Sequence, residues 1–212
     1  MPILSEHVEE YLHGLRPERG EVMGEMEAIA ERDGVPIVHW ETGRLLAILC
    51  RALDPIVLEV GTAIGYSTLH MAQTLQRGRI VTLEVDPERA RQARELWGRA
   101  GVEERIELVE GDARETIDGL AGPFDLLFVD AAKEQYQRYI DLAEPKLSER
   151  AVLVVDNTLM SGEVALAPDA PTSWRAESLA AARALNADIL DSERWLATVL
   201  PVGDGVTFAA RR

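Results

Sequence analysis

From residue 56 onward, short apolar runs alternate with amphipathic segments of helical length, and this alternation constrains the fold more than any other feature. The apolar runs cover 56–60, 80–84, 106–109, 124–129 and 152–155, and the amphipathic segments cover 65–77, 87–100, 113–120 and 133–147. Strands that alternate with helices build right-handed βαβ units and a parallel sheet covered on both faces. The sequence therefore predicts an α/β fold with a doubly wound, mostly parallel sheet.

The two ends of the chain complete this prediction. Residues 1–53 carry apolar side chains at helical spacing, so we expect N-terminal helices before the sheet. Trp195–Pro201 and Val206–Ala210 are apolar runs joined by a Gly-Asp-Gly turn, which predicts an antiparallel hairpin at one sheet edge. The five runs and the hairpin give seven strands. We expect all 212 residues to form one domain, with residues 54–212 as its α/β core.

The charge balance excludes two classes of partner. The chain has 22 basic and 37 acidic residues, a net charge of −15, which repels phosphate backbones and anionic lipids. We therefore expect neither a nucleic acid nor a membrane partner. The first residues, MPILSEHVEE, lack the basic and apolar regions of a signal peptide, which favours a cytoplasmic location. Cys50, the only cysteine, is interpreted as a small buried hydrophobe.

The turn after the first apolar run is the first candidate ligand site. Ligands of an open parallel sheet bind beyond the carboxyl ends of its strands, and Gly61 would let a ligand approach the backbone closely. The dinucleotide fingerprint would require glycine at two positions where this chain has Ala63 and Tyr66. The turn therefore argues against a pyrophosphate, although turn geometry alone explains its glycines equally well.

Acidic residues follow the second and third runs. Glu84, 23 residues after Gly61, either accepts hydrogen bonds from ribose hydroxyls or is a solvated carboxylate at a strand end. Asp112, next to Ala113, either contacts an adenine amino group or caps the following short helix. With the glycine turn, these residues indicate a nucleoside without a diphosphate, such as an adenosine that carries a sulfonium.

Oxygen-bearing side chains follow the fourth and fifth runs. Asp130 ends the fourth run, and Asp156 and Asn157 end the fifth. Adjacent parallel strands end roughly 5 Å apart, so these side chains can converge. Three oxygen donors without Cys or His suit a hard cation such as Mg²⁺. Each residue alone is more typical of a turn or a helix cap, but the combination of all three at two strand ends favours a metal site.

Lys133 is unusual in this chain. Only two of the 22 basic residues are lysines, Lys133 and Lys146. Lys133 lies in the first turn of a predicted helix, where the macrodipole disfavours a cation. A lysine amine, unlike an arginine guanidinium, can lose its proton beside another cation. Lys133 is therefore a candidate general base.

Five segments together resemble a known enzyme family, the cation-dependent O-methyltransferases that include catechol and caffeoyl-CoA O-methyltransferases. The segments are VLEVGTAIGYSTLHMA, TLEVDPERARQA, FDLLFVDAAKEQY, VLVVDNTLMSGEV and LPVGDGVTFAARR. The paired D-x-x-K and D-N motifs are specific to this group, whereas the glycine turn is shared by many methyltransferases. The resemblance covers nearly the whole chain and implies a Rossmann-like methyltransferase fold.

The resemblance also implies roles for individual residues. Asp130, Asp156 and Asn157 correspond to the metal ligands and Lys133 to the catalytic base. His39 falls in the segment that borders the methionine end of the donor, or is only structural. The implied set for binding S-adenosylmethionine comprises Val38, Glu59, Gly61, Thr62, Ser67, Glu84, Asp112, Ala113 and Asp130. The family further implies a divalent cation such as magnesium, a small hydroxylated and aromatic acceptor, and a homodimer.

The chain departs from the family pattern in two places. Ala132 stands where plant-type members have an acid and catechol-type members often have an aromatic residue that packs on adenine, so the adenine pocket must differ. Residues 157–175 form an irregular segment without a recognisable acceptor pattern. Trp174 and Trp40 are either lids over an aromatic substrate or half-buried core residues.

The sequence alone leaves two alternative functions open. The first is a non-catalytic protein that binds the methyl donor, which would not need Lys133 together with the three candidate metal ligands. The second is a nicotinamide-dependent oxidoreductase, which Ala63 and Tyr66 disfavour.

Overall fold

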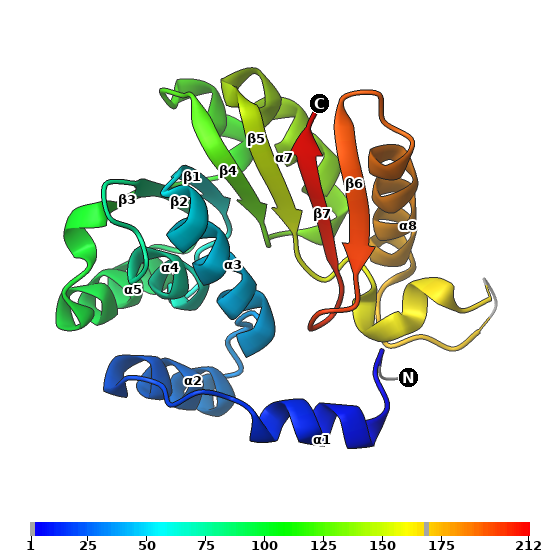
Figure 1. Ribbon diagram of the computed structural model, residues 1–212, viewed down its shortest axis with the longest axis horizontal. Helices are drawn as coiled ribbons and strands as arrows, with labels where there is room; N and C mark the ends of the chain where they lie inside the picture. Colours follow the sequence, from blue (N-terminus) through cyan, green and yellow to red (C-terminus); the bar gives the residue numbers. More distant parts are fainter. Residues whose placement is uncertain (1–2, 168–169) are drawn as a thin grey trace.

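The computed structural model describes residues 3–167 and 170–212, so residues 168 and 169 of the irregular 157–175 segment lie outside the described residues. At its centre is a seven-stranded sheet with the order β3-β2-β1-β4-β5-β7-β6 (Figure 1). The strands are β1 (Ile56–Val60), β2 (Arg79–Glu84), β3 (Ile106–Glu110), β4 (Phe124–Val129), β5 (Leu147–Val155), β6 (Trp195–Leu200) and β7 (Val206–Arg211). Strands β1 to β5 are parallel, and β7 pairs antiparallel with both β5 and β6.

Helices cover both faces of this sheet. They are α1 (Glu6–Gly14), α2 (Glu21–Asp33), α3 (Trp40–Leu53), α4 (Tyr66–Ala72), α5 (Pro87–Ala100), α6 (Ala113–Thr116), α7 (Tyr136–Ala143) and α8 (Ala176–Leu190). Short 3₁₀ turns lie at Glu103–Arg105, Ile117–Gly119, Lys133–Gln135, Glu144–Lys146 and Met160–Ala165. None of these helices, in the part of the chain that is described, is long and apolar enough to cross a membrane.

Two hydrophobic layers hold the helices against the sheet. One layer joins α2, α3, α4 and α5 to one face, and the other joins α7 and α8 to the opposite face. Val57 belongs to the first layer and its neighbour Leu58 to the second, because successive strand residues point to opposite faces. With both faces buried, the strands read as continuous apolar runs. The predicted doubly wound sheet with a hairpin at its edge is therefore confirmed.

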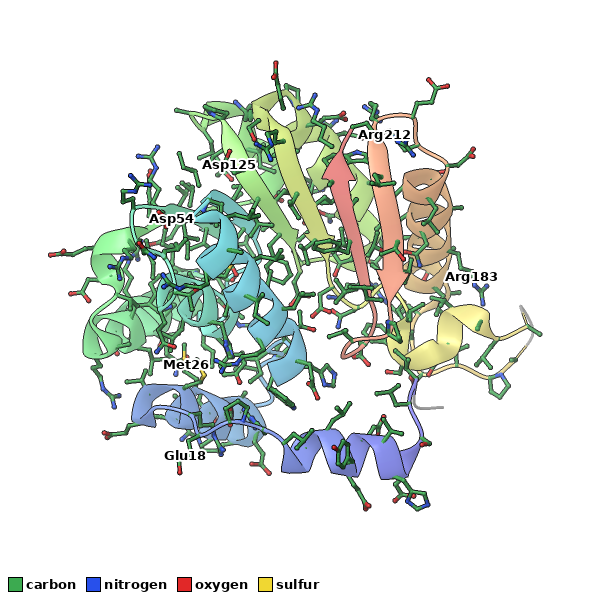
Figure 2. All side chains as sticks on the ribbon, viewed as in Figure 1. Glu18, Met26, Asp54, Asp125, Arg183 and Arg212 are labelled. Atoms are coloured by element: carbon green, nitrogen blue, oxygen red, sulfur yellow. The ribbon has the colours of Figure 1, made fainter. Side chains whose placement is uncertain are left out.

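Side chains fill the space between the helices and the sheet and also project from the outer surface (Figure 2). Met26 of α2 is completely buried and belongs to the first hydrophobic layer. Charged residues such as Glu18, Asp125 and Arg212 lie at the periphery of the molecule (Figure 2). Helix α1 has no buried residue, so packing contributes least to its position.

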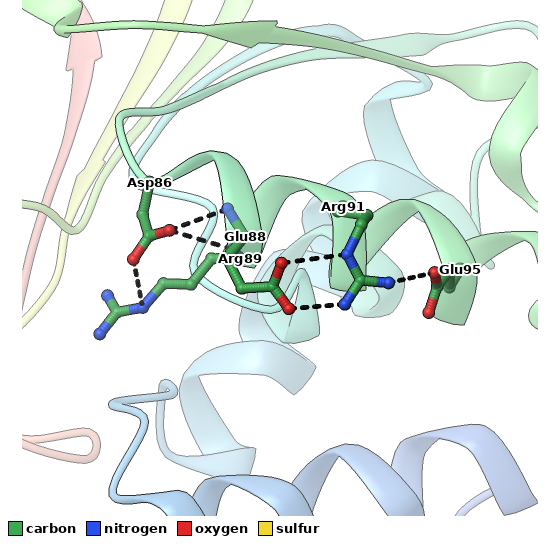
Figure 3. Close-up of polar contacts among 5 residues, drawn as sticks. All are labelled: Asp86, Glu88, Arg89, Arg91 and Glu95. Atoms are coloured by element: carbon green, nitrogen blue, oxygen red, sulfur yellow. Dashed lines mark hydrogen bonds and ion pairs between the residues drawn. The ribbon is translucent and has the colours of Figure 1, made fainter.

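Side chains of helix α5 and of the residue before it stabilise its N-terminus and its exposed face (Figure 3). The Asp86 carboxylate accepts hydrogen bonds from the backbone N–H groups of Glu88 and Arg89, at 2.9 and 3.3 Å. Gly101 ends the helix in the left-handed region, with φ of 67°. On the exposed face, Arg91 pairs with Glu88 and Glu95, contacts worth about 0.2–0.5 kcal/mol each.

The structure differs from the sequence prediction in three segments. Helix α8 was not predicted, because its many alanines blur the apolar periodicity. Strand β5 begins at Leu147, before the predicted 152–155 run, and its first half carries exposed polar residues. The predicted helix at 133–147 is shorter, because Pro145 has no N–H to continue the helical ladder and the chain enters a 3₁₀ turn.

Candidate active site

The sheet register places three strand ends side by side. Val60 of β1 pairs with Val129 of β4, and Val129 pairs with Val155 of β5. The next residue of each strand is therefore at the same edge. The backbone N–H of Asp130 donates to Val60 O at 2.9 Å, and that of Asp156 donates to Val129 O at 3.1 Å. This edge is the carboxyl end of the parallel strands, where ligands of such sheets bind.

Lys133 lies between oxygens from two of these strand ends. Its Nζ donates to Asp130 Oδ1 at 2.7 Å and to Asn157 Oδ1 at 2.5 Å. It also lies 5.3 Å from the centre of the Tyr136 ring, within range of a cation–π contact. The oxygens of Asp130 and Asn157 thus already converge on one positive charge.

Asp156 is the least satisfied group in the site. Its side chain is completely buried, and neither carboxylate oxygen has a hydrogen-bond partner. Burial, together with the charge of Asp130, raises the pKa of Asp156 above its usual range. A buried carboxylate without a partner is costly, and a cation is the group that would compensate it.

These donors fit a hard divalent cation. They comprise two carboxylates and the amide oxygen of Asn157, whose left-handed backbone (φ of 56°) follows Asp156 directly. Oxygen donors of this kind are those that Mg²⁺ takes, usually with further positions left to water or substrate. Among residues 3–167 and 170–212, no cluster of three His, Cys, Asp or Glu side chains forms a metal centre. An ion here would therefore depend on the amide and on exogenous ligands.

A cavity of about 610 Å³ lies over the ends of the strands. This volume is in the range of small-molecule sites. Most of the residues predicted to bind a ligand line it, namely Val38, Gly61, Thr62, Ser67, Glu84, Asp112, Ala113, Asp130, Lys133 and Asn157. Two predicted residues, Glu59 and Asp156, lie beneath its wall and do not line it.

Glycine at position 61 is required by the protein's own backbone. Gly61 has φ of 99°, and a Cβ there would lie 2.1 Å from the carbonyl oxygen of Asp130. Gly65 has φ of 84° and packs against the indole of Trp97, which donates to Gly65 O at 3.0 Å. Turn geometry and close packing therefore explain both glycines without a ligand. The cavity above Gly61 also leaves space for a ligand next to this turn.

Glu84 and Asp112 have both structural contacts and access to the cavity. The Glu84 carboxylate accepts from the N–H of Ala63 at 2.7 Å and of Asp86 at 2.9 Å. Each oxygen keeps capacity for another hydrogen bond. Asp112 accepts from the N–H of Arg114 at 2.8 Å, and hydrogen bonds from Arg114 lower its pKa. Asp112 thus caps α6 and also lines the cavity, so its two sequence alternatives are compatible. Glu84 is only 6% exposed, so the alternative of a solvated carboxylate at the strand end is wrong.

Glu59 acts on the cavity through its neighbours. Its carboxylate, fully buried, accepts from Ser67 Oγ at 2.6 Å and Thr68 Oγ1 at 2.5 Å. Burial raises the pKa of Glu59 to about 7. Because Ser67 lines the cavity, Glu59 positions the first turn of α4 beneath the cavity. Thr62 is fixed in a similar way by Thr82, with 2.6 Å between the hydroxyl oxygens.

Sequence reasoning missed a contribution from the β6–β7 turn. Asp204 lines the cavity, accepts from Ser161 Oγ at 3.0 Å and lies 3.5 Å from His39 Nε2. This contact with Asp204 raises the pKa of His39. The sequence marks residues 203–205 only as a turn, and the position of β7 next to β5 is what brings Asp204 to the site.

The two tryptophans that were candidate lids, Trp174 and Trp40, lie in different parts of the structure. Trp174 lines the cavity and is held there through Glu163, which accepts from the N–H groups of Ser173 at 2.9 Å and Trp174 at 3.3 Å. Trp40 does not line this cavity and lies instead 6.0 Å from the guanidinium of Arg16. Only Trp174 is placed to contact a ligand of this site.

Comparison with known proteins gives consistent results. A family model described as O-methyltransferase matches residues 20–212. A catechol O-methyltransferase of Mycobacterium tuberculosis is 41% identical over 151 residues, covering 70% of this chain and 66% of that protein. The chain thus spans about two thirds of the length of that relative. Catechol O-methyltransferase domain-containing protein 1 of Mus musculus is 36% identical over 188 residues, covering 85% of this chain and 70% of that protein.

Solved structures share the whole architecture. The O-methyltransferase TomG from Streptomyces achromogenes, in complex with SAM, matches with a TM-score of 0.84 at 28% identity, covering 98% of this chain and 99% of that chain. An O-methyltransferase from Bacillus cereus in complex with SAH matches with a TM-score of 0.83 at 26% identity, covering 97% of each chain.

Proposed function

This chain belongs to the O-methyltransferase family, and we propose that it transfers a methyl group from S-adenosylmethionine to one hydroxyl of a catechol-like vicinal diol. The observation that carries this proposal is the arrangement of Lys133 and the unpartnered, buried Asp156 at adjoining strand ends beside the cavity. We further propose that the site uses a divalent cation such as magnesium and that the protein acts in the cytoplasm as a homodimer.

The donor is assigned to the part of the cavity above β1, β2 and β3. Glu84 has free acceptor capacity for ribose hydroxyls, and Asp112 with Ala113 lies where an adenine would be recognised. Gly61, Thr62 and Ser67 form the floor, and Val38 borders the far end. The complexes of TomG with SAM and of the Bacillus cereus enzyme with SAH support this assignment.

The metal is assigned to Asp130, Asp156 and Asn157. A divalent cation at this position supplies a Lewis acid that lowers the pKa of an acceptor hydroxyl. Asp156 gains the counter-charge that its buried carboxylate lacks. Asp130 and Asn157 also contact Lys133, so the same residues orient the base beside the acceptor.

Lys133 is assigned the proton transfer. In its neutral amine form, which a divalent cation held by Asp130, Asp156 and Asn157 would favour, Nζ accepts the proton from the acceptor hydroxyl, and the oxygen then attacks the methyl carbon while the sulfur keeps the electron pair of the broken bond. Trp174, at the wall of the cavity, gives an aromatic acceptor an apolar surface to pack against. Because the donor carries a good leaving group, the remaining task of the protein is alignment.

Methylation of catechol with Mg²⁺, with and without EDTA, tests this function. We expect turnover that EDTA abolishes and that added Mg²⁺ restores, with an unchanged far-UV circular dichroism spectrum in EDTA. Turnover that continues at the same rate in EDTA would refute the metal assignment. Binding of S-adenosylhomocysteine without methylation of any diol in a panel would instead identify a non-catalytic donor-binding protein.

A further inference from the structure

Two polar side chains of the cavity wall, Gln135 and Tyr139, have no role in the proposed function. Gln135 ends a 3₁₀ turn directly before α7, and Tyr139 lies one turn later in that helix. Helix α7 packs against α6, which begins at Ala113 and is capped by Asp112. Gln135 and Tyr139 therefore lie at the end of the cavity that is assigned to adenine.

The amide of Gln135 is held in one orientation and is only partly satisfied. The Tyr139 hydroxyl donates to Gln135 Oε1 at 2.7 Å, and Tyr139 is only 5% exposed. An amide oxygen can accept two hydrogen bonds, and an amide nitrogen can donate two. Within residues 3–167 and 170–212, which the structure describes, no group accepts from Gln135 Nε2. One acceptor position and two donor positions are therefore available to a ligand in the cavity.

Apolar side chains at the same end of the cavity suit a flat ring. Val85, which directly follows β2, lines the cavity and is 69% exposed. The backbone N–H of Gly111 donates to Glu84 O at 2.8 Å, which places Val85 beside the end of β3. Ala132 also lines the cavity, and its carbonyl accepts from the N–H of Gln135 at 2.9 Å. An aromatic ring that covers Val85 would remove this apolar surface from water.

We propose that Gln135, with its orientation fixed by Tyr139, recognises the adenine of S-adenosylmethionine through N6 and N7. Gln135 Nε2 donates to N7 and Oε1 accepts one hydrogen of the N6 amino group, the pairing that glutamine also makes with adenine in DNA. The second N6 hydrogen is left for the Asp112 carboxylate, which lines the same end of the cavity. The inference rests on the proposed function, because it assigns these residues to the donor that this function requires.

Isothermal titration calorimetry of the full chain with S-adenosylhomocysteine and two analogues tests this assignment. The 7-deaza analogue has C–H in place of N7, and the inosine analogue has an oxygen in place of the N6 amino group. We expect both analogues to bind the native protein at least about fivefold more weakly than S-adenosylhomocysteine, because each leaves a polar atom of Gln135 unpaired. In Gln135→Leu, the 7-deaza analogue and S-adenosylhomocysteine should bind equally.

Two further variants separate recognition from a structural role. Gln137→Leu is the matched control, since Gln137 is exposed on α7, donates to Asp141 at 2.8 Å and does not line the cavity. It should keep the native preference among the three ligands. Tyr139→Phe keeps Gln135 but releases its amide, which can then turn Nε2 toward the oxygen of the inosine analogue. The preference for S-adenosylhomocysteine over this analogue should fall at least about fivefold.

The outcomes distinguish this inference from the proposed function. The inference alone is overturned if the native protein binds S-adenosylhomocysteine and both analogues with equal affinity, or if Gln135→Leu keeps the native preference. An unchanged preference in Tyr139→Phe would overturn the role of Tyr139. A native protein that binds none of the three ligands would overturn the proposed function and this inference together.

Discussion

Replacing Glu59 by glutamine removes a buried carboxylate while keeping its shape. In the native protein this carboxylate accepts from Ser67 and Thr68 and has no access to solvent. Burial raises the pKa of Glu59 from 4.5 to about 7. The folded state therefore favours the protonated form, and the associated stability is complete below about pH 4.5 and lost as the pH rises through about 7.

The size of the effect follows from the two pKa values. Above pH 7 this difference lowers the unfolding free energy of the native protein by about 3 kcal/mol relative to its value below pH 4.5. Glutamine does not ionise, and its amide can still meet both hydroxyls because a hydroxyl donates or accepts. Glu59→Gln should therefore be more stable than the native protein at pH 8 and nearly equal to it at pH 5.

Urea unfolding at pH 5, 6, 7 and 8 measures this difference. Glu107→Gln, on the exposed side of β3, reports the effect of losing one surface charge. The expected result is a stability gain for Glu59→Gln that grows with pH and levels off above about pH 7. A gain that is independent of pH, or a loss of stability at pH 8, would contradict the assignment of Glu59 as a buried positioning residue.

Three further substitutions test other parts of the site. Lys133→Ala should lower turnover at least about 100-fold while S-adenosylhomocysteine affinity, measured by calorimetry, changes little; turnover near the native rate would exclude Lys133 as the base. Gly61→Ala should lower the free energy of unfolding, measured by urea denaturation, by at least about 2 kcal/mol, because the new Cβ would clash with Asp130 O. Gly119→Ala is the control, since it has open space around it and should not destabilise the protein. Equal effects of the two substitutions would rule out the close approach at Gly61. Trp174→Ala should raise KM for the diol about tenfold in steady-state assays, and an unchanged KM would place the acceptor elsewhere.

The strands and their edge were predictable because their signals are local. Buried strands such as β1 and β4 read as apolar runs, and the caps of α5 at Asp86 and Gly101 are sequence motifs in themselves. Because β4 and β5 are neighbours in the sheet, as their order in the sequence predicts, Asp130 and Asn157 both lie within hydrogen-bond distance of Lys133.

Other parts of the site depend on long-range packing that no local pattern reports. Asp204 reaches His39 only because β7 is inserted between β5 and β6. The family resemblance assigned Glu59 to ligand binding, and its complete burial in β1 could not be read from the strand pattern. Trp40 and Trp174 were indistinguishable in sequence, and only Trp174 lies in the cavity.

Titration of Mg²⁺ into the native protein and into Asp156→Asn, after removal of metal with EDTA, tests whether Asp156 is a ligand of a divalent cation. Asparagine has the shape of aspartate without the buried charge that lacks a partner. We expect one Mg²⁺ site in the native protein, loss of that site in Asp156→Asn, and greater stability of the variant than of the native protein in EDTA. Equal Mg²⁺ binding by both proteins would contradict this expectation.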